Sequence, residues 1–428
     1  MKIGIVGAGL TGLALQQYLT PRGTESVVFE SSAEPGGVIR SRTVDGRTLE
    51  FGPQRTRLSP PVASLVGELG IGDQRREADD GPLFVYRDGA LRRVPFSIGD
   101  AVATDLLSVR GKLRLLLEPL TDPPRAGETV EESLTRTLGA EAAEYLVGPL
   151  YGGIYGSHPD EMEMEYSLLR ALDTYGVDRS LLAAALRGKL GRSDPSPVVS
   201  FDGGMQALPR AIYERHRNRI HLDTPVEAVR DLDDRFGLET ASGMRIVDRV
   251  VLTTPADVTA TLLDAIAPAA ASELRRLTYN PLALVHLVPE TTMDATGFQV
   301  QYEEAFRTLG VTCNADLFDR DDHYTVFLGG ARTPGLVDWS TSEIRETARR
   351  EFSELTGVAG RVVNVHRLRR GMPAYDTSWS ALDRVETPTG VQLSGNYVSR
   401  AGIPGRIGEA KQLAERASQA AANGSEPR

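Results

Sequence analysis

The sequence feature that most constrains the fold is a glycine-rich turn between an apolar strand and a helix near the N-terminus. Its glycines are Gly7, Gly9 and Gly12, and a second apolar run ends at Glu30. In a βαβ unit, such glycines permit a tight turn, a close approach of backbone to a pyrophosphate, and close packing of helix on strand. The phosphates lie on unpaired N–H groups at the helix N-terminus, and the acid accepts hydrogen bonds from a ribose. The spacing therefore predicts a Rossmann-like dinucleotide site.

Two further features indicate which dinucleotide is bound. A 2′-phosphate favours arginine over a carboxylate at the end of the second strand, so Glu30 disfavours NADP. The glycine pair Gly36-Gly37 lets backbone run beside an extended dinucleotide, which a nicotinamide dehydrogenase does not need. Near the other end of the chain, residues 393–397 and 402–404 contain further glycines. We interpret them as a return segment that completes a flavin pocket, so the intervening chain would fold around one cofactor.

Composition excludes several other classes of protein. The chain has 428 residues, enough for two or three lobes, and a net charge of −10, which argues against a nucleic-acid partner. Cys313 is the only cysteine and the six histidines lack metal-ligand spacing, so we expect no disulfide and no metal site. We find no apolar run of about 18 residues and no leader peptide, which predicts a cytoplasmic protein.

The hydrophobic patterns predict an α/β (α+β) protein with a discontinuous Rossmann-like domain, a substrate domain built on an antiparallel sheet, and an inserted helical lobe. The cofactor domain is predicted over 1–75, 197–265 and 385–428, the substrate domain over 76–97 and 266–384, and the helical lobe over 98–196. Asp45-Gly46 between two strands is typical of a hairpin turn. Helices are predicted at 10–19, 60–70, 106–117, 130–147, 162–190, 208–215, 341–355 and 406–422.

An ordered set of segments resembles the flavin-dependent amine oxidase superfamily and, within it, the oxygen-dependent protoporphyrinogen/coproporphyrinogen oxidases. These segments are Glu30–Arg57, Pro149–Met164, Ser200–Pro209, Arg370–Tyr375 and Gly395–Ile407. Each is weak alone, but their order over almost the whole chain is specific. The resemblance implies FAD as cofactor, a porphyrinogen as substrate, its oxidation to the porphyrin with O2 as acceptor, and a place in heme biosynthesis.

The resemblance also implies roles for individual residues. The residues that it places at FAD are Gly7, Gly9, Gly12, Glu30, Gly37, Arg40, Val226, Gly395, Gly402 and Ile403. At the substrate, it implies that Arg57 binds a propionate, that the carbonyl of Gly153 faces the tetrapyrrole, and that Phe298 packs against a pyrrole ring. A guanidinium reads a carboxylate through paired, charge-assisted hydrogen bonds, which favours Arg57 on chemical grounds, with Arg55 as its rival. No catalytic acid or base is identified, since the flavin itself takes the hydride.

The sequence departs from the family at Gly156-Ser157 and at Pro404-Gly405-Arg406, which leaves the substrate open. One alternative is an amine oxidase or a desaturase of another metabolite, although none of the four lysines occupies the place near the flavin that many amine oxidases use. A second alternative is a non-catalytic member of the superfamily, which the complete glycine motif disfavours. Peripheral membrane contact through Leu106–Leu120 is a further hypothesis, but we interpret these leucines as core. The oligomeric state is left open.

Overall fold

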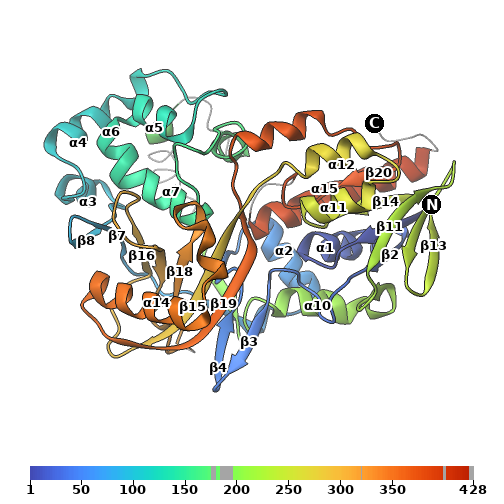
Figure 1. Cartoon of the computed structure of the whole chain (residues 1–428), viewed down its shortest axis with the longest axis horizontal. Helices are drawn as coiled ribbons and strands as arrows, with labels where there is room; N and C mark the ends of the chain where they lie inside the picture. The colour runs from blue at the N-terminus through green and yellow to red at the C-terminus, as the bar shows by residue number, and fades with distance from the viewer. Residues whose placement is uncertain (175–179, 184–195, 320, 399–401, 424–428) are drawn as a thin grey trace. The chain divides into compact units, whose positions relative to one another are not determined.

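The computed structural model describes residues 1–174, 180–183, 196–319, 321–398 and 402–423 (Figure 1). The chain divides into two compact units, and each is described by itself. The first unit comprises Met1–Glu77, Ser196–Leu277 and Ser380–Arg428, and the second comprises Ala78–Pro195 and Thr278–Trp379. The predicted α/β class with parallel and antiparallel sheets is confirmed. The helical segment and the antiparallel sheet lie in the same unit, so a separate helical lobe stays a prediction.

The first unit is built on a five-stranded parallel sheet in the order β10-β2-β1-β14-β20. The strands are β1 (Lys2–Val6), β2 (Glu25–Phe29), β10 (Ile220–His221), β14 (Arg249–Leu252) and β20 (Val391–Leu393). They come from both ends and the middle of the chain, which explains why the unit is discontinuous. The runs Ile3–Val6 and Val250–Leu252 are almost entirely buried, as expected for strands covered on both faces.

Helices cover one face of this sheet and a small meander covers the other. The helices of the unit are α1 (Leu10–Leu19), α2 (Pro60–Leu69), α10 (Ala207–Arg215), α11 (Ala256–Leu263), α12 (Pro268–Leu274) and α15 (Ile403–Asn423). Every residue of α1 is buried, because α2, α10 and α15 pack around it (Figure 1). The meander consists of β11 (Val226–Asp231), β12 (Phe236–Thr240) and β13 (Gly243–Val247). Leu238 of β12 packs against Gly4 of β1.

Smaller strands complete the first unit. They are β3 (Ser41–Val44), β4 (Arg47–Glu50), β5 (Thr56–Arg57), β6 (Arg75–Glu77) and β9 (Val198–Phe201). The predicted hairpin between β3 and β4 is present, with positive φ angles of 50° at Asp45 and 80° at Gly46. The buried carboxylate of Glu50 accepts hydrogen bonds from the Ser41 hydroxyl (2.7 Å) and the Met205 N–H (2.8 Å). This network joins the hairpin to the turn that precedes α10.

The second unit contains a seven-stranded sheet in the order β19-β15-β18-β17-β16-β7-β8, antiparallel except for the β16–β7 pair. The strands are β7 (Leu83–Arg87), β8 (Ala90–Arg93), β15 (Tyr279–Pro289), β16 (Gly297–Val300), β17 (Thr308–Thr312), β18 (Tyr324–Gly329) and β19 (Gly360–Pro373). The amphipathic helix α14 (Thr341–Thr356) buries Ile344 and Phe352 on one face of this sheet. A capping box of Ser340 and Glu343 starts that helix. A short helix, α13 (Asn314–Leu317), follows β17.

The helical segment of the second unit is more broken than the sequence predicts. Its helices are α3 (Ile98–Ala103), α4 (Val109–Leu116), α5 (Val130–Leu138), α6 (Ala140–Ala142), α7 (Gly148–Tyr155) and α8 (Leu168–Thr174), with one π-helical turn at Ala143–Val147. The continuous helix predicted over 130–147 was wrong, because Gly139 (φ 94°, ψ 154°) interrupts it. The helix predicted over 106–117 begins only after Ser108, whose hydroxyl accepts from the Gly111 N–H. Much of the predicted helix 162–190 lies outside the described residues.

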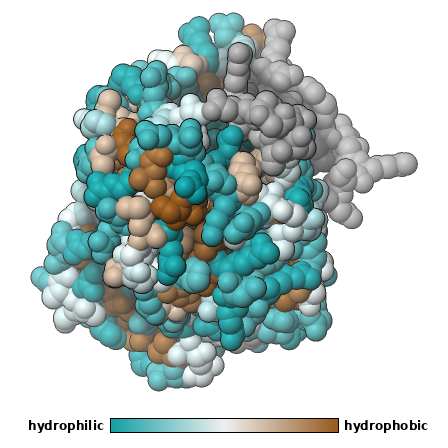
Figure 2. Space-filling view, turned by 90° about the vertical axis from the view of Figure 1, so that its right-hand side faces the viewer, coloured by the Kyte–Doolittle hydropathy of each residue, from teal (hydrophilic) through white to brown (hydrophobic). Residues whose placement is uncertain are grey.

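The exposure of three leucines contradicts their interpretation as core. Leu106 and Leu107 are buried, but Leu113, Leu116 and Leu120 are 61%, 65% and 82% exposed, so these three leucines are not core. No helix among the described residues has both the length and the apolar character needed to span a bilayer. On the face shown in Figure 2, hydrophilic residues predominate and apolar residues gather only in small groups.

Candidate functional site

The carboxyl ends of the parallel strands bring the two glycine segments of the first unit to one edge of the sheet. The N–H of Gly7, directly after β1, donates to the carbonyl of Phe29 (2.8 Å). After β14, the Thr253 hydroxyl donates to the carbonyl of Gly7 (3.0 Å). After β20, the N–H of Ser394 donates to the carbonyl of Leu252 (2.8 Å). Open α/β sheets bind their ligands at this edge.

The glycines of the first turn are required for different reasons. A Cβ on Gly12 would lie 2.1 Å from the carbonyl oxygen of Gly7, so a side chain there would push α1 away from β1. Gly7 has a φ of 108°, which favours glycine. A Cβ on Gly9 would meet no protein atom within 4 Å. The space over Gly9 is therefore open on the side where a ligand would lie.

The start of α1 is suited to an anion. Its N-cap is Gly9, which offers no side-chain cap, and the first turn holds no acidic residue. The first N–H groups of the helix and its positive dipole end are thus left for a ligand. The second glycine pair lies against this turn, because the Gly36 N–H donates to the carbonyl of Ala8 (2.8 Å). Gly37, with a φ of 61°, approaches so closely that its Cβ would lie 3.3 Å from the Cα of Gly9.

Glu30 is held beside the glycine turn by backbone donors. Its carboxylate accepts from the N–H of Ala8 (2.7 Å) and from the N–H of Ser32 (2.8 Å). Each oxygen retains acceptor capacity, which two ribose hydroxyls could use. The Thr224 N–H donates to the carbonyl of Glu30 (2.8 Å), which places the start of β11 at Val226 next to this position. The structure therefore brings Glu30 and Val226 together with the glycine turn.

Arg40 offers an unused donor at the same site. Its Nη2 donates to the hydroxyl of Ser32 (3.1 Å), while its buried Nε has no hydrogen-bond partner among the described residues. A buried guanidinium N–H without a partner is costly, and a phosphate or other anionic acceptor would satisfy it. The open space over Gly9, the uncapped helix and this donor fit the pyrophosphate of a dinucleotide.

The C-terminal segment has no room for a side chain at Gly395. A Cβ on Gly395 would lie 2.7 Å from the carbonyl oxygen of Thr254 and 2.4 Å from the ring of Tyr397. Gly402 has a φ of 92° and is exposed, and Ile403 begins α15 with its side chain buried. Helix α15 packs along α1 (Figure 1), so both ends of the chain contribute to this unit. The contacts of Gly395, Gly402 and Ile403 with the flavin ring stay predictions.

The residues predicted at the substrate are divided between the two units. Arg57 lies in β5 of the first unit, is exposed, and donates to the carbonyl of Ser196 (3.3 Å). Gly153 lies in α7 of the second unit, where a Cβ would come 2.0 Å from Oε1 of Gln299. Phe298 is fully buried in the cluster beneath α14, so the structure gives its predicted contact with a pyrrole ring no support.

The alternation of side chains along β16 explains why Phe298 is buried beneath α14 while the next residue, Gln299, lies near Gly153. Phe298 faces α14, and its neighbour Gln299 therefore faces α7 and Gly153 on the opposite side of the sheet. The Oε1 of Gln299 is buried and has no hydrogen-bond partner among the described residues. Gln299 was not among the residues predicted at the substrate, although its position next to Phe298, on a strand whose other face supplies the core, can be seen in the sequence.

The glycine turn, the acid after β2 and the open α/β sheet define a dinucleotide-binding protein. The chain matches the family model for flavin-containing amine oxidoreductases over residues 10–422, and it belongs to that family. The predicted cofactor is thus confirmed as FAD, and the residues described above fit it.

Similarity to individual proteins extends over nearly the whole chain. The chain is 28% identical over 463 residues to protoporphyrinogen oxidase 2 of Arabidopsis thaliana, covering 92% of this chain and 89% of the relative. It is 25% identical to coproporphyrinogen III oxidase of Mycobacterium leprae, covering 96% and 97%. A crystal structure of a candidate protoporphyrinogen oxidase from Exiguobacterium has the same fold, with a TM-score of 0.80, 24% identity and 98% of each chain covered.

Proposed function

We propose that this protein is an FAD-dependent oxidase that converts protoporphyrinogen IX or coproporphyrinogen III to the porphyrin, with O2 as acceptor, in heme biosynthesis. The observation that carries the proposal is the glycine turn with open space over Gly9, in a chain that is similar over nearly its whole length to porphyrinogen oxidases. When bound, FAD would accept hydride from the substrate and pass the electrons to O2, which becomes peroxide. Three such two-electron steps convert a porphyrinogen to a porphyrin.

In this proposal, the protein binds and orients the cofactor. The first-turn N–H groups of α1 and the guanidinium of Arg40 would hold the pyrophosphate, and Glu30 would accept from the adenosine ribose. Val226 would lie at the adenine, and the backbone at Gly395, Gly402 and Ile403 would lie near the flavin. The assignments of Val226, Gly395, Gly402 and Ile403 rest on the family resemblance, while those of Glu30 and the start of α1 are also supported by their position beside the glycine turn.

Arg57 is proposed to hold a propionate of the substrate. Its exposed guanidinium donates one hydrogen bond to the backbone carbonyl of Ser196 (3.3 Å), which leaves other N–H donors for a carboxylate. Arg57→Lys keeps the charge but removes the paired geometry, and we expect KM for a porphyrinogen to rise by about tenfold, since charge-assisted hydrogen bonds contribute about 1.5–3 kcal/mol. Arg57→Ala should raise it further with FAD content unchanged.

The described lysines weigh against the amine oxidase alternative. Lys2 lies in β1, Lys112 in α4 and Lys411 in α15, and none of them lies on the seven-stranded sheet of the second unit. Anaerobic mixing of the purified, FAD-loaded protein with each porphyrinogen tests the proposal, with a primary amine as the control substrate. Loss of the oxidised flavin absorbance with a porphyrinogen, and its return on adding O2, is the expected result. Bleaching by the amine alone would reject the porphyrinogen assignment.

We also propose that the protein is cytoplasmic and that its second unit makes peripheral contact with the cytoplasmic face of a membrane. Seven large apolar residues between positions 96 and 120 are more than half exposed. They are Phe96, Val102, Val109, Leu113, Leu116, Leu117 and Leu120. Basic residues Arg110 and Lys112 alternate with them on α4, a composition that favours an anionic bilayer surface.

Co-sedimentation with vesicles containing anionic lipid tests this proposal. We expect the double variant Leu113→Ser, Leu116→Ser to remain in the supernatant while the wild type sediments. Leu232→Ser is the matched control, because Leu232 is a partly exposed leucine of the first unit (40%). A wild-type protein that stays wholly in the supernatant would reject the membrane contact.

A further inference from the structure

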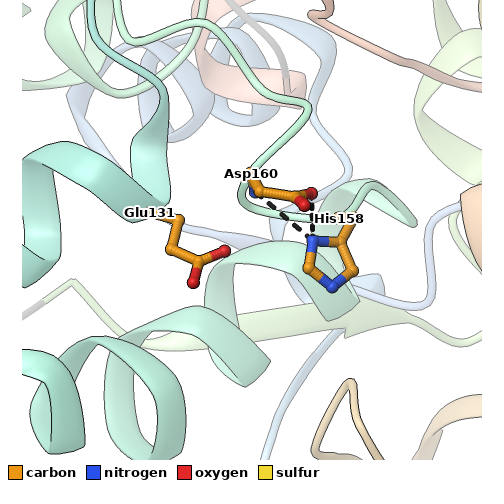
Figure 3. A group of neighbouring side chains, drawn as sticks. All are labelled: Glu131, His158 and Asp160. Atoms are coloured by element: carbon orange, nitrogen blue, oxygen red, sulfur yellow. Dashed lines mark hydrogen bonds and ion pairs between the residues drawn. The ribbon is translucent and has the colours of Figure 1, made fainter.

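A group of metal-ligating side chains lies in the second unit, apart from the residues proposed to hold FAD. Glu131 is in the first turn of α5, and His158 and Asp160 are in the loop after α7 (Figure 3). One ligand atom from each residue lies within 4.8 Å of the others. Nδ1 of His158 contacts the carboxylate of Asp160, and the carboxylate of Glu131 points toward the same region.

The backbone holds these two segments together independently of the side chains. The N–H of Glu131 donates to the carbonyl of Pro159 (3.0 Å), and the N–H of Val130 donates to the carbonyl of Met162 (2.8 Å). A capping box of Thr129 and Glu132 fixes the start of α5. The edge of the Tyr302 ring packs on His158, with centroids 4.5 Å apart. The three ligands are therefore presented from an ordered frame.

Carboxylates outnumber the single imidazole in this group. Glu303 is a third carboxylate, with Oε1 3.7 Å from Nε2 of His158. Among the described residues, neither Glu131, Asp160 nor Glu303 forms an ion pair with an arginine or lysine, although the chain has 48 of them. A divalent cation placed among these three carboxylates would be attracted by each of them.

We propose that Glu131, His158 and Asp160 bind a divalent transition-metal ion of the zinc class. One imidazole nitrogen with two carboxylate oxygens suits Zn2+, whereas Mg2+ and Ca2+ prefer sites made of oxygen alone. Ligand bonds of about 2.0–2.2 Å require the donor atoms to rearrange around the ion, which the exposed carboxylates of Glu131 and Asp160 can do by rotating. With the metal at Nδ1, Nε2 of His158 would donate to Glu303, as second carboxylates do in many metal sites.

The ion would join the start of α5 to the loop that follows α7. It would stabilise this part of the second unit rather than take part in flavin chemistry, and the inference does not depend on the substrate. The histidine spacing predicted no metal site, and Glu131 lies far along the chain from His158. Only the fold brings them together.

Isothermal titration of the tag-free, FAD-loaded full chain with Zn2+ tests the proposal. We expect one ion per chain and a rise in Tm with Zn2+. His158→Ala, Glu131→Gln and Asp160→Asn should each weaken binding by at least tenfold. Glu165→Gln is the matched control, because it removes an exposed carboxylate of the same segment outside the group, and it should bind as the wild type does.

The Tm of each variant without metal is measured as well, so that loss of binding is not confused with loss of folding. Asp160→Asn, at an exposed position, should unfold within a few degrees of the wild type. Equal affinity in the wild type and His158→Ala, or binding of Mg2+ and Ca2+ but not Zn2+, would overturn the proposal. A Zn2+ affinity weakened equally by Glu165→Gln would also overturn it, since binding would then be diffuse.

Discussion

Alanine substitutions at Gly9 and Gly12 should separate cofactor binding from folding, although the two glycines belong to one turn. A Cβ at Gly12 would lie 2.1 Å from the carbonyl oxygen of Gly7 and 3.2 Å from Cγ2 of Ile5, so α1 or β1 must move. Overpacking of this kind costs about 1–3 kcal/mol, from which the higher helix propensity of alanine subtracts about 1 kcal/mol. We therefore expect Gly12→Ala to lower the free energy of unfolding of the apoprotein by up to about 2 kcal/mol.

Gly9→Ala should instead weaken FAD binding with little loss of stability. Gly9 has φ −67° and ψ 173°, which alanine adopts freely, and its Cβ would meet no protein atom within 4 Å. The apoprotein should lose only a few tenths of a kcal/mol, from the poorer N-cap. A methyl group placed against the pyrophosphate should cost about 1–3 kcal/mol of binding, which corresponds to about a 5- to 150-fold higher Kd for FAD.

The assay has two parts for each variant. Urea unfolding of the apoprotein gives the free energy of unfolding, and titration of the same apoprotein with FAD gives Kd. The reasoning predicts a stability change mainly in Gly12→Ala and an affinity change without loss of stability in Gly9→Ala. Wild-type FAD affinity in Gly9→Ala would refute the placement of the pyrophosphate over this turn.

Three further predictions concern single side chains. Arg40→Met should raise Kd for FAD by about 10- to 100-fold, since a hydrogen bond to a charged group contributes about 1.5–3 kcal/mol. Hydrogen bonding from Arg136 lowers the pKa of Glu128 from 4.5 to about 2. The ion pair therefore stabilises the fold fully above pH 4.5, and this stabilisation is lost as the pH falls toward 2. Glu128→Gln should flatten the pH dependence of the free energy of unfolding between these two values. Gly153→Ala should displace Gln299 and lower Tm, and adding Gln299→Ala should restore it, as a double-mutant cycle can measure.

The sequence by itself determined the cofactor class and predicted the residues proposed to hold it. The spacing of Gly7, Gly9 and Gly12 and the acid at Glu30 are local features, because a tight turn, a close backbone approach and a strand end depend on neighbouring residues. The Asp45-Gly46 hairpin was predicted for the same reason. FAD and the α/β class could therefore be inferred before any tertiary contact was known, and the order of the family segments added the porphyrinogen oxidase resemblance.

The tertiary structure decided which faces of the elements are buried and which distant residues meet. The leucines of α4 read as core, yet Leu113 and Leu116 are exposed, because an apolar pattern does not say whether another element covers it. Phe298 and Gln299 face opposite sides of β16, and only the position of α14 shows which of them is core. Glu131 meets His158 through the loop after α7, a contact that depends on how distant segments pack rather than on their spacing in the chain.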